Sequence, residues 1–180
     1  EDISRGQIPT LATLLSTVRE LGYYKLNTYH LYIEDAFDFE ALRGGRPARD
    51  LLTAEELALV CREGARHHVT VVPVIQTLGH QERLLSLPRF QHLAEIRPTL
   101  IDQVRAWVRS WFAGVQGRAN VATAATRSGP PATEPVLTSL CPTDPEVRKL
   151  MRTLVTEIGR CTSAPFLHCG GDEPFQVGQG

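Results

Sequence analysis

Residues 165–173 of the chain read Pro-Phe-Leu-His-Cys-Gly-Gly-Asp-Glu. The first five of these residues predict a short strand, which runs directly into two glycines and then into two adjacent acids, Asp172 and Glu173. In parallel α/β folds, ligands bind at the carboxyl ends of the strands, and glycines there let a substrate or a neighbouring backbone come close.

Adjacent carboxyl groups at such a strand end indicate acid–base chemistry. Consecutive side chains diverge, but in a partly apolar site the two carboxylates still repel each other. We therefore expect either Asp172 or Glu173 to have a raised pKa and to keep a proton that it can donate. The alternative interpretation is structural: a polar turn after a strand, in which Asp172 caps a following helix.

Patterns typical of strands and helices alternate upstream of this segment. Thr10 is a plausible N-cap for apolar residues at helical spacing, and Gly22 is a plausible stop. Thr53 and Glu56 have capping-box spacing and open a helix that runs to about His67. The predicted strands are residues 3–5, 26–33, 69–75 and 165–169, and the predicted helices are residues 11–21, 53–67, 100–111 and 145–158.

This alternation predicts the α/β class, with a parallel sheet and helices packed outside it. The sheet is either open and doubly wound or part of a TIM (β/α)8 barrel. A complete barrel needs about 200–250 residues, whereas this chain has 180 residues. The barrel interpretation therefore implies a partial TIM barrel, about strands 1–4 with intervening helices, truncated at the C-terminus. Residues 76–143 would form a long loop after the third strand, with a low-complexity segment at 115–135.

Composition excludes some classes of function and leaves others open. The net charge of -1 gives no electrostatic footprint for nucleic acid. No apolar run approaches the roughly 20 residues that a membrane-spanning helix needs. The four cysteines have no spacing typical of zinc or redox motifs, so we expect free thiols, and no pattern indicates a compartment or an oligomeric state.

Several segments, in the same order along the chain, resemble glycoside hydrolase family 20, the β-N-acetylhexosaminidases. Residues 167–173 are similar to the family's signature His/Asn-x-Gly-Gly-Asp-Glu, which ends its fourth barrel strand, and residues 139–146 resemble the lead-in to the next helix. The segments that resemble the family's first, second and third strands are Asp2-Ile3-Ser4-Arg5, residues 24–35 and residues 72–80. The whole chain, residues 1–180, is thus interpreted as part of the family's catalytic domain.

The resemblance implies a glycosidase that removes terminal N-acetyl-β-D-hexosamine from oligosaccharides or glycoconjugates without a cofactor. It also implies a substrate-assisted retaining mechanism, in which the 2-acetamido oxygen attacks the anomeric carbon and gives an oxazolinium intermediate. Glu173 would act as general acid and then as general base. Asp172 would orient the acetamido group and stabilise the positive charge that develops on it.

The resemblance also suggests residues that bind or support the sugar. Arg5 would hydrogen-bond hydroxyl groups, although it could instead form a surface ion pair. His80 would lie behind the acids and pair with Glu34 or Asp35, although it could equally be a structural histidine, and the two acids a solvated loop start. No metal is expected, since the neighbouring His67 and His68 point apart on a helix.

The sequence departs from the family in the third-strand segment and in the long loop. Gln76 stands where many members carry an acid, and Leu78 replaces a common proline. We expect the intact protein to be active and residues 1–180 alone to be inactive, because half a barrel leaves unpaired sheet edges and an unfilled core. The alternatives are a barrel glycosidase with a protein nucleophile and a carbohydrate-binding pseudoenzyme or inactive barrel fragment.

Overall fold

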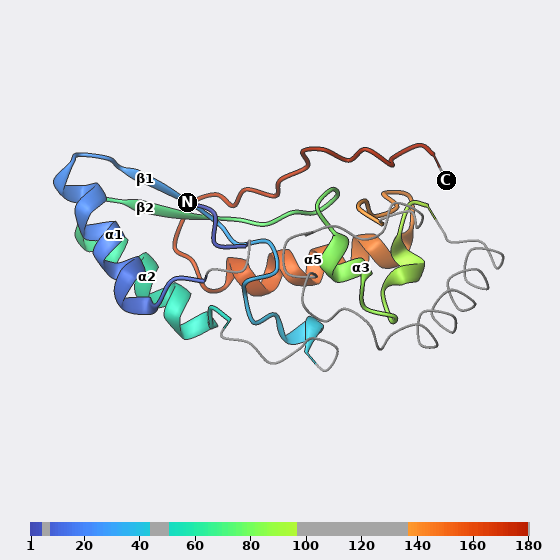
Figure 1. Cartoon of the computed structure of the whole chain (residues 1–180). Coiled ribbons are helices and arrows are strands. Elements are labelled where there is room, and N and C mark those ends of the chain that lie inside the picture. Colours follow the sequence, from blue (N-terminus) through green and yellow to red (C-terminus); the bar gives the residue numbers. More distant parts are fainter. Residues whose placement is uncertain (5–7, 44–50, 97–136, 180) are drawn as a thin grey trace, which may run out of the picture.

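A small parallel sheet organises the computed structural model, which describes residues 1–4, 8–43, 51–96 and 137–179 (Figure 1). Strand β1 (Thr28–Tyr32) pairs with β2 (Thr70–Val74) in register, from Thr28 opposite Thr70 to Tyr32 opposite Val74. The helices are α1 (Leu11–Tyr23), η1 (Glu40–Leu42), α2 (Ala54–Arg66), α3 (Glu82–Leu85), η2 (Gln91–Leu93) and α5 (Pro145–Gly159).

Two further segments extend this sheet, one on each side. Asp2 forms a parallel bridge with Tyr32, and His168 forms a parallel bridge with Val74. The four parallel segments therefore lie side by side in the order of the sequence. A doubly wound sheet reverses its strand order at a switch point, and no reversal occurs among these segments. The order is that of an arc of a barrel.

The fourth segment is shorter than the sequence predicts, whereas the predicted strand 3–5 includes Arg5, which lies outside the described residues. The predicted strand at 165–169 pairs only around His168, whose carbonyl oxygen accepts from the Ile75 N–H at 3.0 Å and whose N–H donates to the Pro73 carbonyl at 3.2 Å. At the other side, the Ile3 N–H donates to the Tyr32 carbonyl at 3.0 Å. Within the described ranges each outer segment pairs with a strand on one side only, through a few hydrogen bonds.

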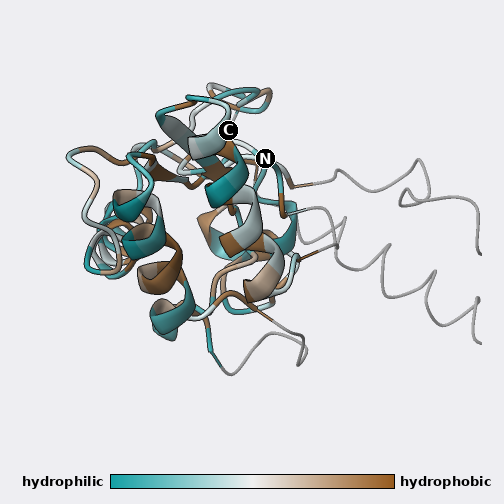
Figure 2. Cartoon of the chain, turned by 90° about the vertical axis from the view of Figure 1, so that its left-hand side faces the viewer, coloured by the Kyte–Doolittle hydropathy of each residue, from teal (hydrophilic) through white to brown (hydrophobic). Residues whose placement is uncertain are grey.

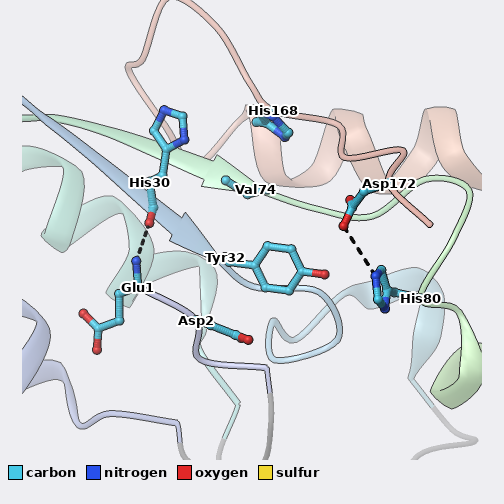
Figure 3. A pocket seen from close by; sticks show the side chains of 8 residues that line it. All are labelled: Glu1, Asp2, His30, Tyr32, Val74, His80, His168 and Asp172. Atoms are coloured by element: carbon cyan, nitrogen blue, oxygen red, sulfur yellow. Dashed lines mark hydrogen bonds and ion pairs between the residues drawn. The ribbon is translucent and has the colours of Figure 1, made fainter.

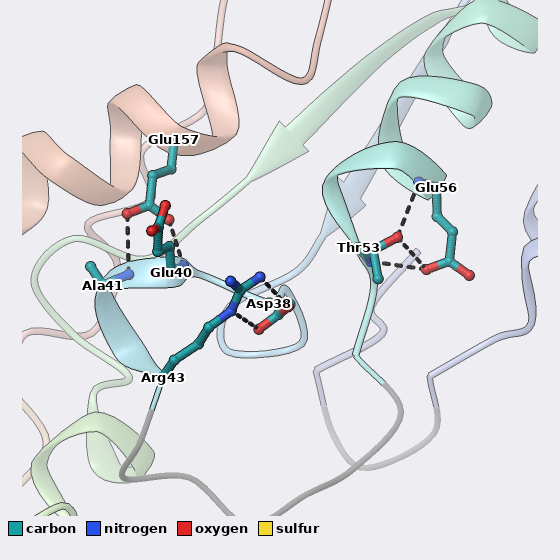
Figure 4. A network of polar contacts seen from close by, with 7 residues as sticks. All are labelled: Asp38, Glu40, Ala41, Arg43, Thr53, Glu56 and Glu157. Carbon is teal, nitrogen blue, oxygen red and sulfur yellow. Dashed lines mark hydrogen bonds and ion pairs between the residues drawn. The ribbon is translucent and has the colours of Figure 1, made fainter.

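The long helices begin where the sequence predicts. The Thr10 side chain accepts from the Thr13 N–H and caps α1, which ends at Tyr23, one residue beyond the expected stop. The Thr53–Glu56 capping box is present: the Glu56 N–H donates to the Thr53 hydroxyl at 3.2 Å, and the Thr53 N–H donates to the Glu56 carboxylate at 2.9 Å (Figure 4). Asp144 caps α5, with Pro145 in its first turn.

The main core lies between the sheet and the helices. Helices α1, α2 and α5 lie on the same side of the strands (Figure 1), and the helices carry both hydrophilic and hydrophobic segments (Figure 2). Tyr29 and Leu31 of β1 point into this core, whereas His30 between them is exposed. Among the described residues the helices cover one face of the sheet, as in an arc of a barrel, whereas a doubly wound sheet is covered on both faces. The other face of the sheet is left for a site.

The predicted loop at 76–143 contains short helices in its described part. Helices α3 and η2 lie there, as does an antiparallel bridge between Ala94 and Leu140. Each helix is a single turn, too short for a period to emerge from the sequence. The predicted helix at 100–111 and the low-complexity segment at 115–135 lie outside the described residues.

Three further findings bear on the sequence predictions. All four cysteines are free, as expected. Within the described ranges, none of the helices combines the length and the apolar character that crossing a membrane would need. Helix η1 was not predicted from the sequence; the Glu157 carboxylate of α5 accepts from the Glu40 and Ala41 N–H groups at 2.8 and 3.3 Å and so fixes its first turn (Figure 4).

Candidate active site

A cavity of about 400 Å³ opens on the face of the sheet that the helices leave free (Figure 3). It takes side chains from all four parallel segments, because alternate residues of a strand point to the same face. Its lining residues are Glu1, Asp2, His30, Tyr32, Val74, His80, His168 and Asp172. The candidate acid Asp172 therefore lies on the inner face of the arc, beyond the end of the fourth segment.

The Asp172 carboxylate is held at both oxygens, although its side chain is 61% exposed. Its Oδ1 accepts a hydrogen bond of 2.6 Å from Gln76 Nε2. Its Oδ2 lies 3.4 Å from His80 Nε2, as Figure 3 shows. The hydrogen bond from Gln76 is the main reason that the pKa of Asp172 lies below its usual value, and the nearby His80 adds to the shift. Asp172 is thus suited to remain ionised.

Glu173 shares the same histidine. Its Oε2 lies 3.3 Å from His80 Nε2, and its side chain is 57% exposed, so it can reach both the histidine and a ligand. Glu173 and His80 both have left-handed backbones, with φ of 50° and 54°. Such φ values are uncommon outside glycine, and strained residues of this kind cluster at functional sites.

His80 and the two acids are brought together by a close approach of their backbones, and this approach explains why residue 79 is a glycine. A Cβ atom at Gly79 would collide with the carbonyl oxygen of Asp172 and lie 3.0 Å from that of Glu173. The turn that carries His80 therefore packs directly against the backbone of the two acids. Only glycine leaves room for this contact, which the sequence analysis did not predict for Gly79.

Two buried glutamines, Gln76 and Gln81, hydrogen-bond to the groups that form the site, and neither was predicted as a site residue. Gln76 is 5% exposed and contacts Asp172 through its amide. Gln81 Nε2 donates to the carbonyl oxygens of Gln76 and Gly79, at 2.9 and 3.1 Å. The only signal in the sequence was that Gln76 stands where the resembling family often has an acid.

The other predicted residues divide into three cases. Arg5 lies outside the described residues. Asp35 forms an ion pair with Arg83 at 3.2 Å. Glu34 lies near His80, since donor atoms of Glu34, His80 and Glu82 fall within 4.8 Å of one another. Glu34 therefore lies close to His80, which also contacts the two acids.

In the described part of the chain, Glu34, His80 and Glu82 form the group whose ligand atoms lie close enough together to hold a metal cation. Glu82 is exposed, and exposed acids often gather without binding an ion. We assign no metal to the group. His67, one of the two adjacent histidines considered from the sequence, lies 3.5 Å from the Glu63 carboxylate.

Comparison with known proteins bears on this geometry. The family model "Glycosyl hydrolase family 20, catalytic domain" matches residues 2–178. No curated protein matches the chain significantly.

Solved structures show the same arrangement of elements. The chain is 23% identical to a glycoside hydrolase family 20 β-N-acetylglucosaminidase, with a TM-score of 0.64, over 96% of this chain and 36% of that one. It is 20% identical to the β-N-acetylhexosaminidase of Streptomyces coelicolor A3(2), with a TM-score of 0.63, over 99% and 33% of the two chains. It is 17% identical to the Flavobacterium johnsoniae chitobiase, with a TM-score of 0.68, over 97% of this chain and 23% of that one. The chain thus spans about a third or less of the length of these structures.

Proposed function

Starting from the premise that this chain belongs to glycosyl hydrolase family 20, whose catalytic-domain model matches residues 2–178, we propose that the intact protein is a β-N-acetylhexosaminidase. It removes terminal non-reducing N-acetylglucosamine or N-acetylgalactosamine from a glycan. The described residues supply part of a TIM barrel, the family's catalytic fold. The chain covers 36% of the solved β-N-acetylglucosaminidase, so the activity is proposed for the whole protein.

One observation supports this function above the others: two acids with different surroundings share one histidine beside an open cavity. His80 Nε2 lies 3.4 Å from Asp172 and 3.3 Å from Glu173. Asp172 also accepts the hydrogen bond from Gln76, and its pKa is lowered. Titratable groups that share a site but differ in environment can take separate roles in acid–base catalysis.

Glu173 is proposed as the general acid and base. In the first step its carboxyl group gives its proton to the leaving-group oxygen while the bond from that oxygen to the anomeric carbon breaks. The resulting carboxylate, near His80 Nε2, then takes a proton from the water that attacks the anomeric carbon. The Glu173 side chain is 57% exposed, so its carboxyl group is accessible to a bound glycan and to water.

Asp172 is proposed to act on the 2-acetamido group of the sugar. The acetamido oxygen forms a bond to the anomeric carbon as the leaving group departs, and the amide nitrogen becomes positively charged. A carboxylate that stays ionised and points into the cavity can accept the acetamido N–H and stabilise this charge. Arg5 would bind hydroxyl groups of the same sugar through its guanidinium.

The test compares leaving groups in the intact protein carrying Glu173→Gln. Loss of a general acid should matter most for a poor leaving group, so hydrolysis of a natural disaccharide should fall by about 10²–10⁴-fold. An aryl glycoside with an acidic phenol should be affected less. Equal loss for both substrates, or no loss, would contradict the role of Glu173. Binding of N-acetylglucosamine by the unaltered protein without any hydrolysis would favour a pseudoenzyme.

A further inference from the structure

Gln76 occupies a position in which every polar atom of its amide has a defined partner. It follows β2 by two residues and is 5% exposed. Its Nε2 donates to Asp172 Oδ1 at 2.6 Å and to the Tyr32 hydroxyl at 2.9 Å. Its Oε1 accepts from the Gly171 N–H at 3.0 Å. One side chain thus connects the second, third and fourth parallel segments.

These contacts fix which end of the amide faces the acid. A backbone N–H only donates, so the atom that faces Gly171 must be the amide oxygen. The amide nitrogen is then directed at Asp172 and Tyr32, and a flipped amide would place an oxygen against the carboxylate. The neighbouring backbone also preserves the space for this side chain, because a Cβ atom at Gly170 would collide with the Gln76 amide.

We propose that Gln76 is a positioning residue for the reaction: its amide N–H holds Oδ1 of Asp172, so that the carboxylate stays ionised and oriented towards the 2-acetamido group. The proposal rests on the proposed hexosaminidase function for its consequence, but its geometry stands on the structure alone. Gln76 does not itself touch the sugar. It acts through Asp172.

The charge of residue 76 determines how well it can do this. A glutamate in the same place would have the same length but would lose the donor and add a negative charge against Asp172. Two carboxylates at hydrogen-bond distance cannot both ionise easily, so one of them would hold a proton at a higher pH. The lowered pKa of Asp172, for which the bond from Gln76 is the first cause, agrees with the neutral amide.

Other charged groups face Asp172 and would remain in such a variant. The imidazole of His80 lies 3.4 Å from Asp172, and the carboxylate of Glu173 lies 3.3 Å from the same imidazole nitrogen. The cavity wall adds Glu1, Asp2, His30 and His168 from the neighbouring segments, together with the Tyr32 hydroxyl. Because all of them are common to the wild type and the variant, a difference between the two reports residue 76.

The experiment compares Gln76→Glu and Gln76→Met with a matched control, Thr77→Val, in the intact protein. Thr77 is the adjacent residue, and its hydroxyl donates to the Cys169 carbonyl rather than to either acid. For Gln76→Glu we expect kcat to fall about 10-fold or more, KM to change little, and the acid limb of the kcat profile to move to higher pH. Thr77→Val should leave the profile in place.

A second measurement is independent of activity, and in it Gln76→Met, which removes the amide donor without adding a charge, replaces Gln76→Glu if Gln76→Glu does not fold. The carboxyl carbon of Asp172 is titrated by ¹³C NMR, assigned with Asp172→Asn, in each variant that melts as a folded protein. An upward shift of the pH midpoint of Asp172 in Gln76→Glu supports the positioning role of Gln76. This holds even if the wild type hydrolyses no hexosaminide, a result that would contradict only the proposed function. An unchanged midpoint in Gln76→Glu overturns the role of Gln76, whatever happens to kcat.

Discussion

Replacing Gly79 by alanine tests whether close backbone approach assembles the site. The added Cβ atom would overlap the Asp172 carbonyl oxygen and lie 3.0 Å from the Glu173 carbonyl oxygen and 3.1 Å from the Glu173 carbonyl carbon. All three obstacles are backbone atoms, so no side-chain rotation relieves the clash. Either the turn that carries His80 or the segment that carries the two acids must move away.

The size of the effect follows from the overlap. Restoring ordinary van der Waals contact requires a displacement of about 1 Å, and a displacement of that size at reacting groups costs roughly 10²-fold in rate. We therefore expect kcat of Gly79→Ala for an aryl N-acetylhexosaminide to fall about 10²-fold.

Gly159→Ala is the matched control for this substitution. Gly159 is the last residue of α5 and lies away from the cavity lining, and a Cβ atom added to it would meet no other atom within 4 Å. The same Gly→Ala change there should leave kcat unchanged and stability equal or higher by about 0.4–1 kcal/mol. If Gly79→Ala and Gly159→Ala had kcat values within about two-fold of each other while both proteins stayed folded, the packing of the His80 turn against the acids would be refuted.

Three further predictions follow from the structure. Thr53→Ala should lower the free energy of unfolding by about 1 kcal/mol in a denaturant titration, because it removes the N-cap of α2. Thr153→Ala, at an exposed position of α5, is the control and should have no such effect. Equal losses of stability in the two variants would contradict the role of Thr53 as a cap. Leu31→Ala should cost about 2–5 kcal/mol, since Leu31 is fully buried between the sheet and the helices, and a cost within about 0.5 kcal/mol of zero, as at an ordinary surface site, would place the core elsewhere. Because the pKa of Asp172 is lowered, its carboxylate should persist as pH falls and be protonated only below the usual pKa of about 3.9. The measurement is the pH dependence of kcat/KM, with the acid limb assigned to Asp172 by mutation. An Asp172 limb above about 3.9 would contradict the hydrogen bond from Gln76.

Local signals in the sequence were sufficient for much of the fold. The caps at Thr10 and Thr53 and the apolar run of β2 are short-range features, so the residues themselves determine them. The fourth segment was predicted too long because pairing depends on neighbours that a sequence pattern does not contain. The single-turn elements η1, α3 and η2 were missed for a related reason: they are held by tertiary contacts, as in the cap that Glu157 provides to η1.

The part of the site whose residues are adjacent in the sequence was predictable, whereas the contacts between residues far apart in the sequence were less so. Asp172 and Glu173 follow a strand directly, and the pattern alone indicated them as candidates. His80 was expected to pair with Glu34 or Asp35, but its contacts with the two acids depend on how the Gly79 turn packs against residues 172 and 173. Gln76 had no signal for its role, because its importance comes from hydrogen bonds to residues 44 and 96 positions away.

The most direct measurement of the central claim is the ratio of kcat/KM for two aryl glycosides that differ only at carbon 2, one with an acetamido group and one with a hydroxyl group. If Asp172 and Glu173 promote attack by the acetamido oxygen, the intact protein should prefer the acetamido substrate by about 10³-fold or more, since only that substrate carries its own nucleophile. Comparable kcat/KM values for the two glycosides would contradict the account, because they would require a nucleophile supplied by the protein.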